Sequence, residues 1–253
     1  RGEGAPWAPG GAAPVPGRDM VRLEPRAGVL RVGATARDHR VQAAAPGEGR
    51  DGARRAPGRR LRHIAGGLPA GATVTLRRDA EIEGRPRPRL DIECEAGVVT
   101  LAAPCGEDDW LQLSGTVEES RDGGTLDGAS LVPVLRRLRG FISTEETRYY
   151  LNGVFLHARD GALAAVATDG HRLALAHDVG GADLRGEALA ALLAGCESKY
   201  GAAGIIVPRS TVAAFLRLFG VDDEIEFTLE MGRRAGESSA TPSFPARVVF
   251  AAG

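Results

Sequence analysis

The segment GALAAVAT, from Gly161 to Thr168, decides the fold, because the chain carries a second version of it, GVLRVGAT, from Gly28 to Thr35. Farther along, each version is followed by a helical pattern that starts at a proline, Pro57 in the first copy and Pro208 in the second. The same order of elements in both copies is the signature of a repeated structural unit. Two homologous α+β domains are therefore expected, each a meander of antiparallel strands with helices on one face.

The helix after each proline has a clear apolar side. Each proline is expected to open its helix at a first-turn position, where a missing N–H leaves no hydrogen bond unmade. Apolar residues then recur at helical spacing, namely Leu61, Ile64, Ala65 and Leu68 in the first copy and Val212, Phe215, Leu216 and Phe219 in the second. An alternating strand is expected after each helix, at 74–76 and at 225–227.

The second copy has a further helix ahead of its sheet, and Ser130 is expected to cap its N-terminus. The apolar stripe of this helix consists of Leu131, Val134, Leu135, Leu138 and Phe141. The stretch 148–178 then predicts three antiparallel strands, with a hairpin turn at Arg159-Asp160-Gly161. Tyr149 and Tyr150 fall at the start of the first strand, so their side chains are expected to point to opposite faces.

The charges nearly balance, with 32 Lys and Arg against 33 Asp and Glu and a net charge of −1. Arginines nevertheless cluster, at Arg54, Arg55, Arg59, Arg60 and Arg62, and again at Arg136, Arg137 and Arg139. Such local basic surfaces can hold a polyanion, and the alternative is that they only solvate helix faces. Three scattered cysteines predict neither a disulfide framework nor a zinc site. The same cysteine usage predicts a cytosolic protein with reduced thiols, and neither a signal peptide nor an apolar segment of membrane length is visible.

The stretch from Arg148 to Ala176, RYYLNGVFLHARDGALAAVATDGHRLALA, resembles the middle domain of bacterial DNA polymerase III beta subunits, the replication sliding clamps. That family shows RYYLNG, a hairpin, ATDGHRLA, and then VPRK opening a helix. Here the last motif reads IVPRS, at 206–210, so that Ser210 replaces the family's lysine. The first copy fits as well, through VLRVGAT, its PGRRL helix and a terminal DDW at 108–110. The resemblance covers roughly residues 20–253.

The resemblance implies tandem sliding-clamp domains. We expect a disordered Pro/Gly-rich leader at 1–17, a first clamp domain at 18–113 without its N-terminal helix, and a middle clamp domain at 114–253. The middle domain is expected to lack its closing strand and to carry an insertion at about 181–200. The third domain of the family is expected to be absent.

Clamps of this family are built from three such domains, and two chains close head-to-tail into a ring around duplex DNA. The resemblance implies a processivity factor, with no cofactor, metal or catalytic residue, that tethers the replicative polymerase during DNA replication. Polymerase activity itself belongs to the holoenzyme. The residues expected to face sequence-independent duplex DNA are Arg148, Tyr149, Tyr150, Arg209, Arg136, Arg139, Arg59 and Arg60.

The resemblance also implies a protein-binding pocket for short linear peptides of the polymerase III alpha subunit and the clamp loader. The matching positions are Leu151, Thr168, Gly170, His171, Arg172 and Leu173. Leucines offer a slot for an apolar anchor, and a glycine lets a peptide approach the backbone. Without the resemblance, TDGH is simply a tight turn between strands. The family's other pocket wall comes from the end of the middle domain and the third domain, so half a pocket is expected here.

Two rival interpretations remain at this point. A hydrolase using Asp169 and His171 is the first, but no nucleophile elbow, metal-ligand cluster or phosphate loop accompanies them. A degenerate or mobile-element clamp relative without ring-forming ability is the second. No membrane association is expected, and we expect this chain to form no ring, although a full-length version would form a homodimeric one.

Overall fold

The computed structural model describes residues 20–36, 38–50, 52–78, 89–102, 116–180, 186–194, 196, 203–233 and 244–252. The chain divides into two compact units, Arg1–Leu113 and Ser114–Gly253. The expected leader at 1–17 and the DDW motif at 108–110 lie outside the described residues, as does part of the expected insertion at 181–200.

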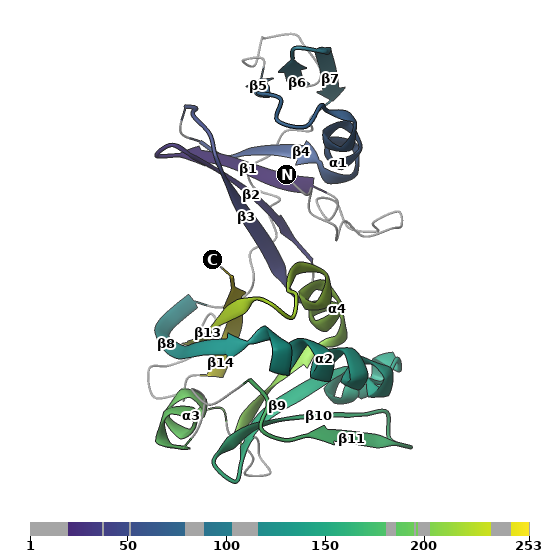
Figure 1. Ribbon diagram of the computed structural model, residues 1–253, viewed down its shortest axis with the longest axis vertical. Coiled ribbons are helices and arrows are strands. Elements are labelled where there is room, and N and C mark those ends of the chain that lie inside the picture. The colour runs from purple at the N-terminus through teal and green to yellow at the C-terminus, as the bar shows by residue number, and fades with distance from the viewer. Residues whose placement is uncertain are drawn as a thin grey trace. The chain divides into compact units, whose positions relative to one another are not determined.

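Unit 1 combines two antiparallel sheets and one helix (Figure 1). The first sheet has the order β3-β2-β1-β4, formed by β1 (Met20–Arg26), β2 (Val29–Thr35), β3 (Arg40–Pro46) and β4 (Arg54–Pro57). The helix α1 (Gly58–Gly67) follows directly and contacts β1 and β4. The second sheet has the order β5-β6-β7, formed by β5 (Thr75–Arg78), β6 (Arg89–Cys94) and β7 (Gly97–Ala102).

Unit 2 repeats this plan with additional elements. Its four-stranded sheet has the order β11-β10-β9-β12, formed by β9 (Gly153–Arg159), β10 (Ala162–Thr168), β11 (Leu173–Ala176) and β12 (Gly204–Pro208). Its three-stranded sheet has the order β14-β13-β8, formed by β8 (Thr116–Asp127), β13 (Glu224–Arg233) and β14 (Phe244–Ala251). The helical elements are α2 (Gly128–Leu138), the short 3-10 turns η1 (Arg139–Phe141) and η2 (Glu146–Leu151), α3 (Gly186–Leu193) and α4 (Arg209–Leu218).

The repeated segments occupy equivalent strands. GVLRVGAT forms β2 and GALAAVAT forms β10, apart from the first glycine of each segment. The two strands hold equivalent places in their sheets, β2 between β3 and β1, and β10 between β11 and β9. In both units the outer strand of the sheet, β4 or β12, leads straight into a helix, α1 or α4. The predicted α+β class with antiparallel sheets and helices is therefore confirmed.

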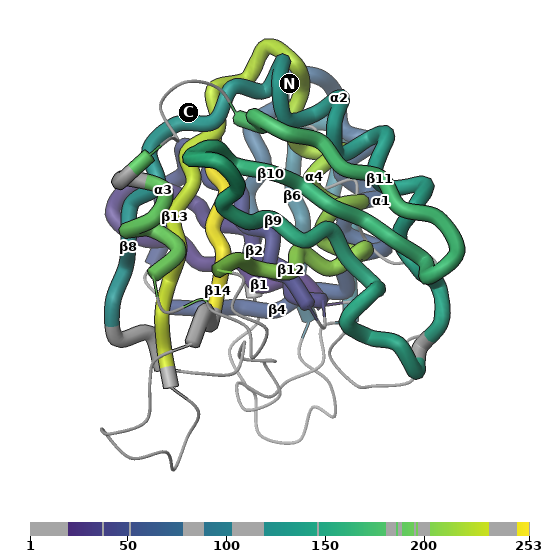
Figure 2. The backbone as a smooth tube through the Cα atoms, turned by 90° about the horizontal axis from the view of Figure 1, so that it is seen from below, coloured from purple at the N-terminus to yellow at the C-terminus, as the bar shows by residue number. Residues whose placement is uncertain are grey.

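The helices α2 and α4 pack side by side over the four-stranded sheet of unit 2. They pack against each other, and α2 covers β10 and β11 while α4 covers β9 and β12 (Figure 1). Leu131 and Leu135 of α2 and Phe215 of α4 are almost fully buried in the core between the helices and the sheets. Figure 2 shows α3 beside β8, at the other flank of unit 2 from β11.

The beginnings of the helices differ in detail from the prediction. Pro57 and Pro208 are the cap residues just before α1 and α4, not first-turn residues. Ser130 does not cap α2, because Asp127 does: its carboxylate accepts from the Ala129 N–H at 2.9 Å and from the Ser130 hydroxyl at 2.8 Å. The Ser130 hydroxyl and the backbone N–H groups of Ala129 and Ser130 lower the pKa of Asp127. The Ser130 side chain thus supports the cap from inside the helix.

Two further expectations about local structure need correction. Tyr149 and Tyr150 lie in η2 rather than at the start of a strand, and both are largely exposed. Ala65, predicted to face the core from α1, is exposed. The predicted hairpin turn is confirmed, because Asp160 and Gly161 both adopt positive φ, 50° and 74°, between β9 and β10, as a type I′ turn requires.

The start of β9 is fixed by a close backbone approach at Gly153. This residue pairs with Pro208 of β12, and a Cβ atom on it would meet the Val207 carbonyl oxygen and lie 2.6 Å from Ile206 Cγ2. Any side chain at this position would push β9 and β12 apart. The register of the two strands therefore depends on a glycine here.

Replacing Gly153 by alanine should destabilise unit 2 by about 1–3 kcal/mol, because a buried backbone contact cannot yield as a flexible side chain can. Gly140→Ala is the matched control, since a Cβ atom there would meet nothing within 4 Å. Urea unfolding of both variants measures the difference. Equal midpoints for the two variants would show that the close approach is not required.

Candidate functional site

The segment from Thr168 to Leu173 is a tight turn that joins β10 to β11. The Thr168 hydroxyl donates to the Arg172 carbonyl oxygen at 2.8 Å and accepts from the Gly170 N–H at 3.1 Å. Gly170 has a φ of 90°, a conformation that favours glycine. The turn is thus closed on itself by the hydroxyl at its base.

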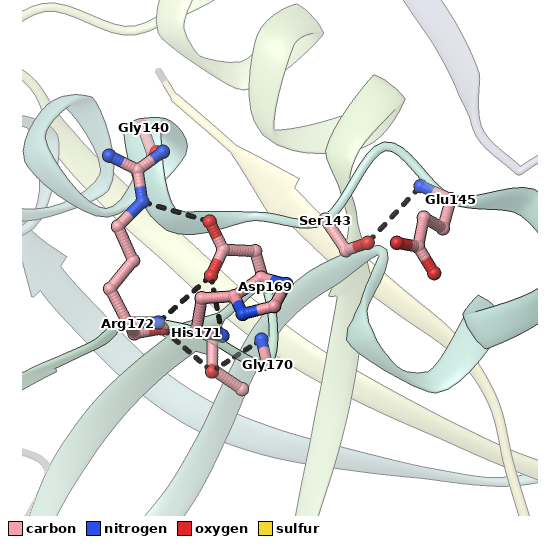
Figure 3. Close-up of polar contacts among 8 residues, drawn as sticks. Gly140, Ser143, Glu145, Asp169, Gly170, His171 and Arg172 are labelled. Carbon is pink, nitrogen blue, oxygen red and sulfur yellow. Dashed lines mark hydrogen bonds and ion pairs between the residues drawn. The ribbon is translucent and has the colours of Figure 1, made fainter.

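Asp169 organises the same turn from its other side (Figure 3). One carboxylate oxygen accepts from the backbone N–H groups of His171 and Arg172, each at 3.0 Å. The other accepts from the Arg172 guanidinium at 2.8 Å. The Arg172 side chain, together with these backbone donors, holds the pKa of Asp169 far below its ordinary value. A carboxylate stabilised in this way is a poor proton acceptor at neutral pH, which argues against the hydrolase interpretation.

Arg172 connects the turn to η1, the 3-10 turn that follows α2. Its guanidinium donates to the Gly140 carbonyl oxygen at 2.9 Å and lies over the Phe141 ring, 5.3 Å from the centroid. Figure 3 shows this side chain reaching from the turn towards Gly140. The guanidinium of Arg172 is therefore engaged in contacts within the protein, although Arg172 is exposed to solvent.

The proposed peptide-binding positions come together around this turn. Gly170, His171 and Leu173 are exposed, and 63% of Leu173 is accessible to solvent. Leu151 lies on η2, and η2 lies beside the turn, since a Cβ atom on Gly170 would be 3.0 Å from a guanidinium nitrogen of Arg148. Thr168 and Arg172 serve the turn itself through the bonds described above. A large exposed leucine beside a glycine-containing turn is suited to an apolar anchor residue.

Several exposed arginines of unit 2 lie on α2 and α4 or next to them. Arg136 and Arg139, on α2 and η1, are exposed, and Arg209 is exposed at the first position of α4. Arg148 forms an ion pair with Glu145 at 3.3 Å. Tyr149 and Tyr150 are 77% and 57% exposed, with their rings edge-to-face at 5.7 Å.

The corresponding residues of unit 1, Arg59 and Arg60, are exposed on α1. Leu61 and Ile64 of the same helix pack against the core of unit 1. The arginines therefore occupy the outward side of the helix, as the spacing of its apolar residues predicts.

Sequence reasoning missed the structural role of Asp169, which it considered only as a catalytic candidate. An aspartate two residues before a backbone N–H donor is the signature of an Asx turn, and TDGH carries that signal. It also missed the carbonyl of Gly140 and the ring of Phe141 as partners of Arg172. No local pattern could have indicated them, because they lie on a different element.

Among the described residues, no group of three or more His, Cys, Asp and Glu side chains is placed to hold a metal ion. In the same part of the chain, no helix is long and apolar enough to cross a membrane. Cys94 is half-buried and Cys196 is buried.

Comparisons with known proteins agree with this architecture. The family of the DNA polymerase III beta subunit, central domain, matches residues 125–179. The beta sliding clamp of Caulobacter vibrioides is 37% identical over 168 residues, covering 64% of this chain and 39% of that protein. The beta sliding clamp of Proteus mirabilis is 30% identical over 186 residues, covering 72% and 42%. A solved beta sliding clamp from C. crescentus superposes with a TM-score of 0.66 at 27% identity, covering 86% of this chain and 54% of that one.

These matches agree with the fold, which is that of α+β sliding-clamp domains. More particularly, the chain is a homologue of the bacterial beta sliding clamps. The chain spans about half the length of the relatives it matches, or less.

Removing the Asp169 carboxylate should loosen the turn between β10 and β11. In Asp169→Ala, the backbone amides of His171 and Arg172 should exchange several-fold faster with solvent, because both lose their acceptor. NMR-detected hydrogen exchange measures this, with Asp160→Ala in the β9–β10 turn as the matched control. Unchanged exchange at both amides would contradict the assigned role.

The same turn should resist acid. Because folding lowers the pKa of Asp169, its stabilising contribution is fully present above the ordinary aspartate value of about 3.9 and is lost only as the pH falls through the lower folded value. Amide signals of the turn should therefore keep their native positions at pH 4 or thereabouts. Disappearance of those signals near pH 5 would contradict this sign.

Proposed function

We propose that this protein is a sliding clamp that works in the cytoplasm as a processivity factor, encircling duplex DNA and tethering the replicative DNA polymerase and other clamp-binding proteins. The observation that carries the proposal is the pair of packed helices, α2 and α4, whose buried sides hold the domain together while their outer sides present arginines. Ring closure around DNA, as a homodimer that includes further clamp domains, is part of the same proposal.

The charge distribution suits a nucleic acid that is bound independently of its base sequence. The net charge is −1, yet α2, η1 and α4 each carry an exposed arginine, namely Arg136, Arg139 and Arg209. Arginines that contact phosphates supply affinity that is independent of base sequence and weakens with salt. Weak contacts of this kind let a protein slide, provided that a closed ring prevents its escape.

The exposed residues of the β10–β11 turn support the second half of the proposal. Leu173 and His171 offer apolar and aromatic surface next to a turn that Asp169 and Arg172 hold in place. The solved C. crescentus clamp, 27% identical to this chain, carries polyethylene glycol in the region assigned as its beta-motif tethering region. We propose that the turn, with Leu151, binds short linear peptides of the polymerase III alpha subunit and of the clamp loader.

Arg136→Ala and Arg209→Ala should each weaken duplex binding at low salt. Each should also flatten the dependence of log affinity on log salt by about one unit for every phosphate that the variant no longer neutralises. Titration of a labelled duplex at several salt concentrations measures both effects. Arg159→Ala is the control, because Arg159 is exposed in the β9–β10 region, not on the helix pair. Equal weakening in all three variants would point to non-specific attraction instead of a DNA-facing surface.

Leu173→Ala and His171→Ala should weaken binding of a labelled peptide that carries the clamp-binding segment of a polymerase III alpha subunit. Truncating a central apolar anchor site costs about 2 kcal/mol or more, which corresponds to roughly a 30-fold drop in affinity. Fluorescence anisotropy measures it, and Ile206→Ala, which removes an exposed apolar residue of β12, is the control. Unchanged affinity in both turn variants would remove the pocket assignment.

A further inference from the structure

The exposed residues Arg148, Tyr149 and Tyr150 belong to a closed loop that runs from Ser143 to Asn152. At its base, the backbone N–H of Ser143 donates to the Leu151 carbonyl oxygen at 3.1 Å. The Ser143 hydroxyl accepts from the Glu145 N–H at 3.1 Å, and Ser143 is only 3% exposed. The loop therefore has a buried, hydrogen-bonded foot and an exposed tip.

Asn152 makes the bonds that join this loop to its neighbours. Its side-chain amide donates to the Glu145 carbonyl oxygen at 2.8 Å, and its backbone N–H donates to the Tyr149 carbonyl oxygen at 3.1 Å. Its own carbonyl oxygen accepts from the Arg209 N–H at 2.8 Å. One residue thus contacts the entry of the loop, its tip and the first residue of α4.

The position of Asn152 is itself fixed by the sheet. The next residue, Gly153, lies against β12 with no room for a Cβ atom and pairs with Pro208. Because β12 leads directly into α4, the carbonyl of Asn152 stands opposite the first N–H of that helix. The side-chain amide of Asn152 also donates to the Glu145 carbonyl oxygen, and the Glu145 carboxylate forms an ion pair with Arg148. Asn152 therefore links the start of α4 to the loop that carries Arg148.

We propose that Asn152 is a positioning residue that holds the Arg148–Tyr150 tip and Arg209 in one fixed arrangement for contact with duplex DNA. The inference rests on the proposed function, and it assigns Asn152 no contact with the DNA. Side chains that must be ordered on binding weaken affinity, whereas side chains already held in place do not. The exposed tyrosines have little packing of their own, so the loop's internal hydrogen bonds must supply this order.

The composition of the chain allows a direct test. Asn152 is the only asparagine in the sequence, and there are three tyrosines, Tyr149, Tyr150 and Tyr200. Selective labelling with ¹⁵N-asparagine therefore gives a single side-chain amide pair, and fluorotyrosine gives three ¹⁹F signals. We expect the wild-type amide pair to be shifted and protected from exchange, and the signals of Tyr149 and Tyr150 to differ from that of free tyrosine.

Two variants separate the hydrogen bond from the volume of the side chain. Asn152→Asp keeps the shape but removes the donor to Glu145, and Asn152→Ala removes both. Each should move the ¹⁹F signals of Tyr149 and Tyr150 towards the free value and lower duplex affinity by roughly two- to tenfold. Thr144→Ala, at an exposed position of the same loop, should change neither readout.

A double-mutant cycle tests positioning against general destabilisation. If Asn152 acts through the tip, Asn152→Asp should cost little further affinity in a Tyr149→Ala background, while its effect should add fully to that of Arg59→Ala in unit 1. Unchanged ¹⁹F signals in Asn152→Asp, or full additivity with Tyr149→Ala, would overturn the inference. Absence of any duplex binding by the wild-type chain would instead count against the proposed function, and the NMR readouts would still decide the role of Asn152.

Discussion

The antiparallel pairing of β9 with β12 is the constraint on which the site of unit 2 depends. It places Gly153 opposite Pro208, so that the segment before β9 meets the segment that starts α4. Two stretches far apart in the sequence, one ending at Asn152 and one beginning at Arg209, thereby become neighbours, and the Arg209 N–H donates to the Asn152 carbonyl oxygen. The same plan recurs in unit 1, where β1 pairs with β4 and Met20 lies opposite Pro57.

In this arrangement the buried side of each helix packs in the core, and the exposed side is free to carry charged residues. The buried sides of α2 and α4 contribute apolar residues to one continuous core with the sheets, and that burial stabilises the domain. The outer sides can then carry arginines without a cost in packing. A chain with almost no net charge can in this way present a basic surface for a polyanion while the rest of its surface stays balanced.

The β10–β11 turn shows why a residue type alone does not define a function. Asp169 and His171 flank a glycine and could be taken for an acid–base pair, yet the carboxylate is engaged by Arg172 and two backbone N–H groups. Arg172 in turn fastens the turn to Gly140 and Phe141. The exposed neighbours Leu173 and His171 are thereby held in place, as the proposed peptide binding requires.

The sequence by itself determined the parts of this protein that local patterns encode. Spacing and turn chemistry within a few residues predict the repeat, the helices after Pro57 and Pro208, the stripe of α2 and the hairpin turn at Arg159-Asp160-Gly161. The resemblance of the RYYLNG and ATDGHRLA motifs to sliding clamps also follows from the sequence alone.

Only the tertiary structure decided what depends on partners from other elements. Asp127 caps α2 instead of Ser130, because the residue at the end of β8 stands before the first turn of the helix. Tyr149 and Tyr150 lie in a 3-10 turn since Asn152 and Ser143 bond back across the loop. The roles of Asn152 and Arg172 could not be inferred from their neighbours in the chain, because each acts through a carbonyl or N–H that folding alone brings within reach.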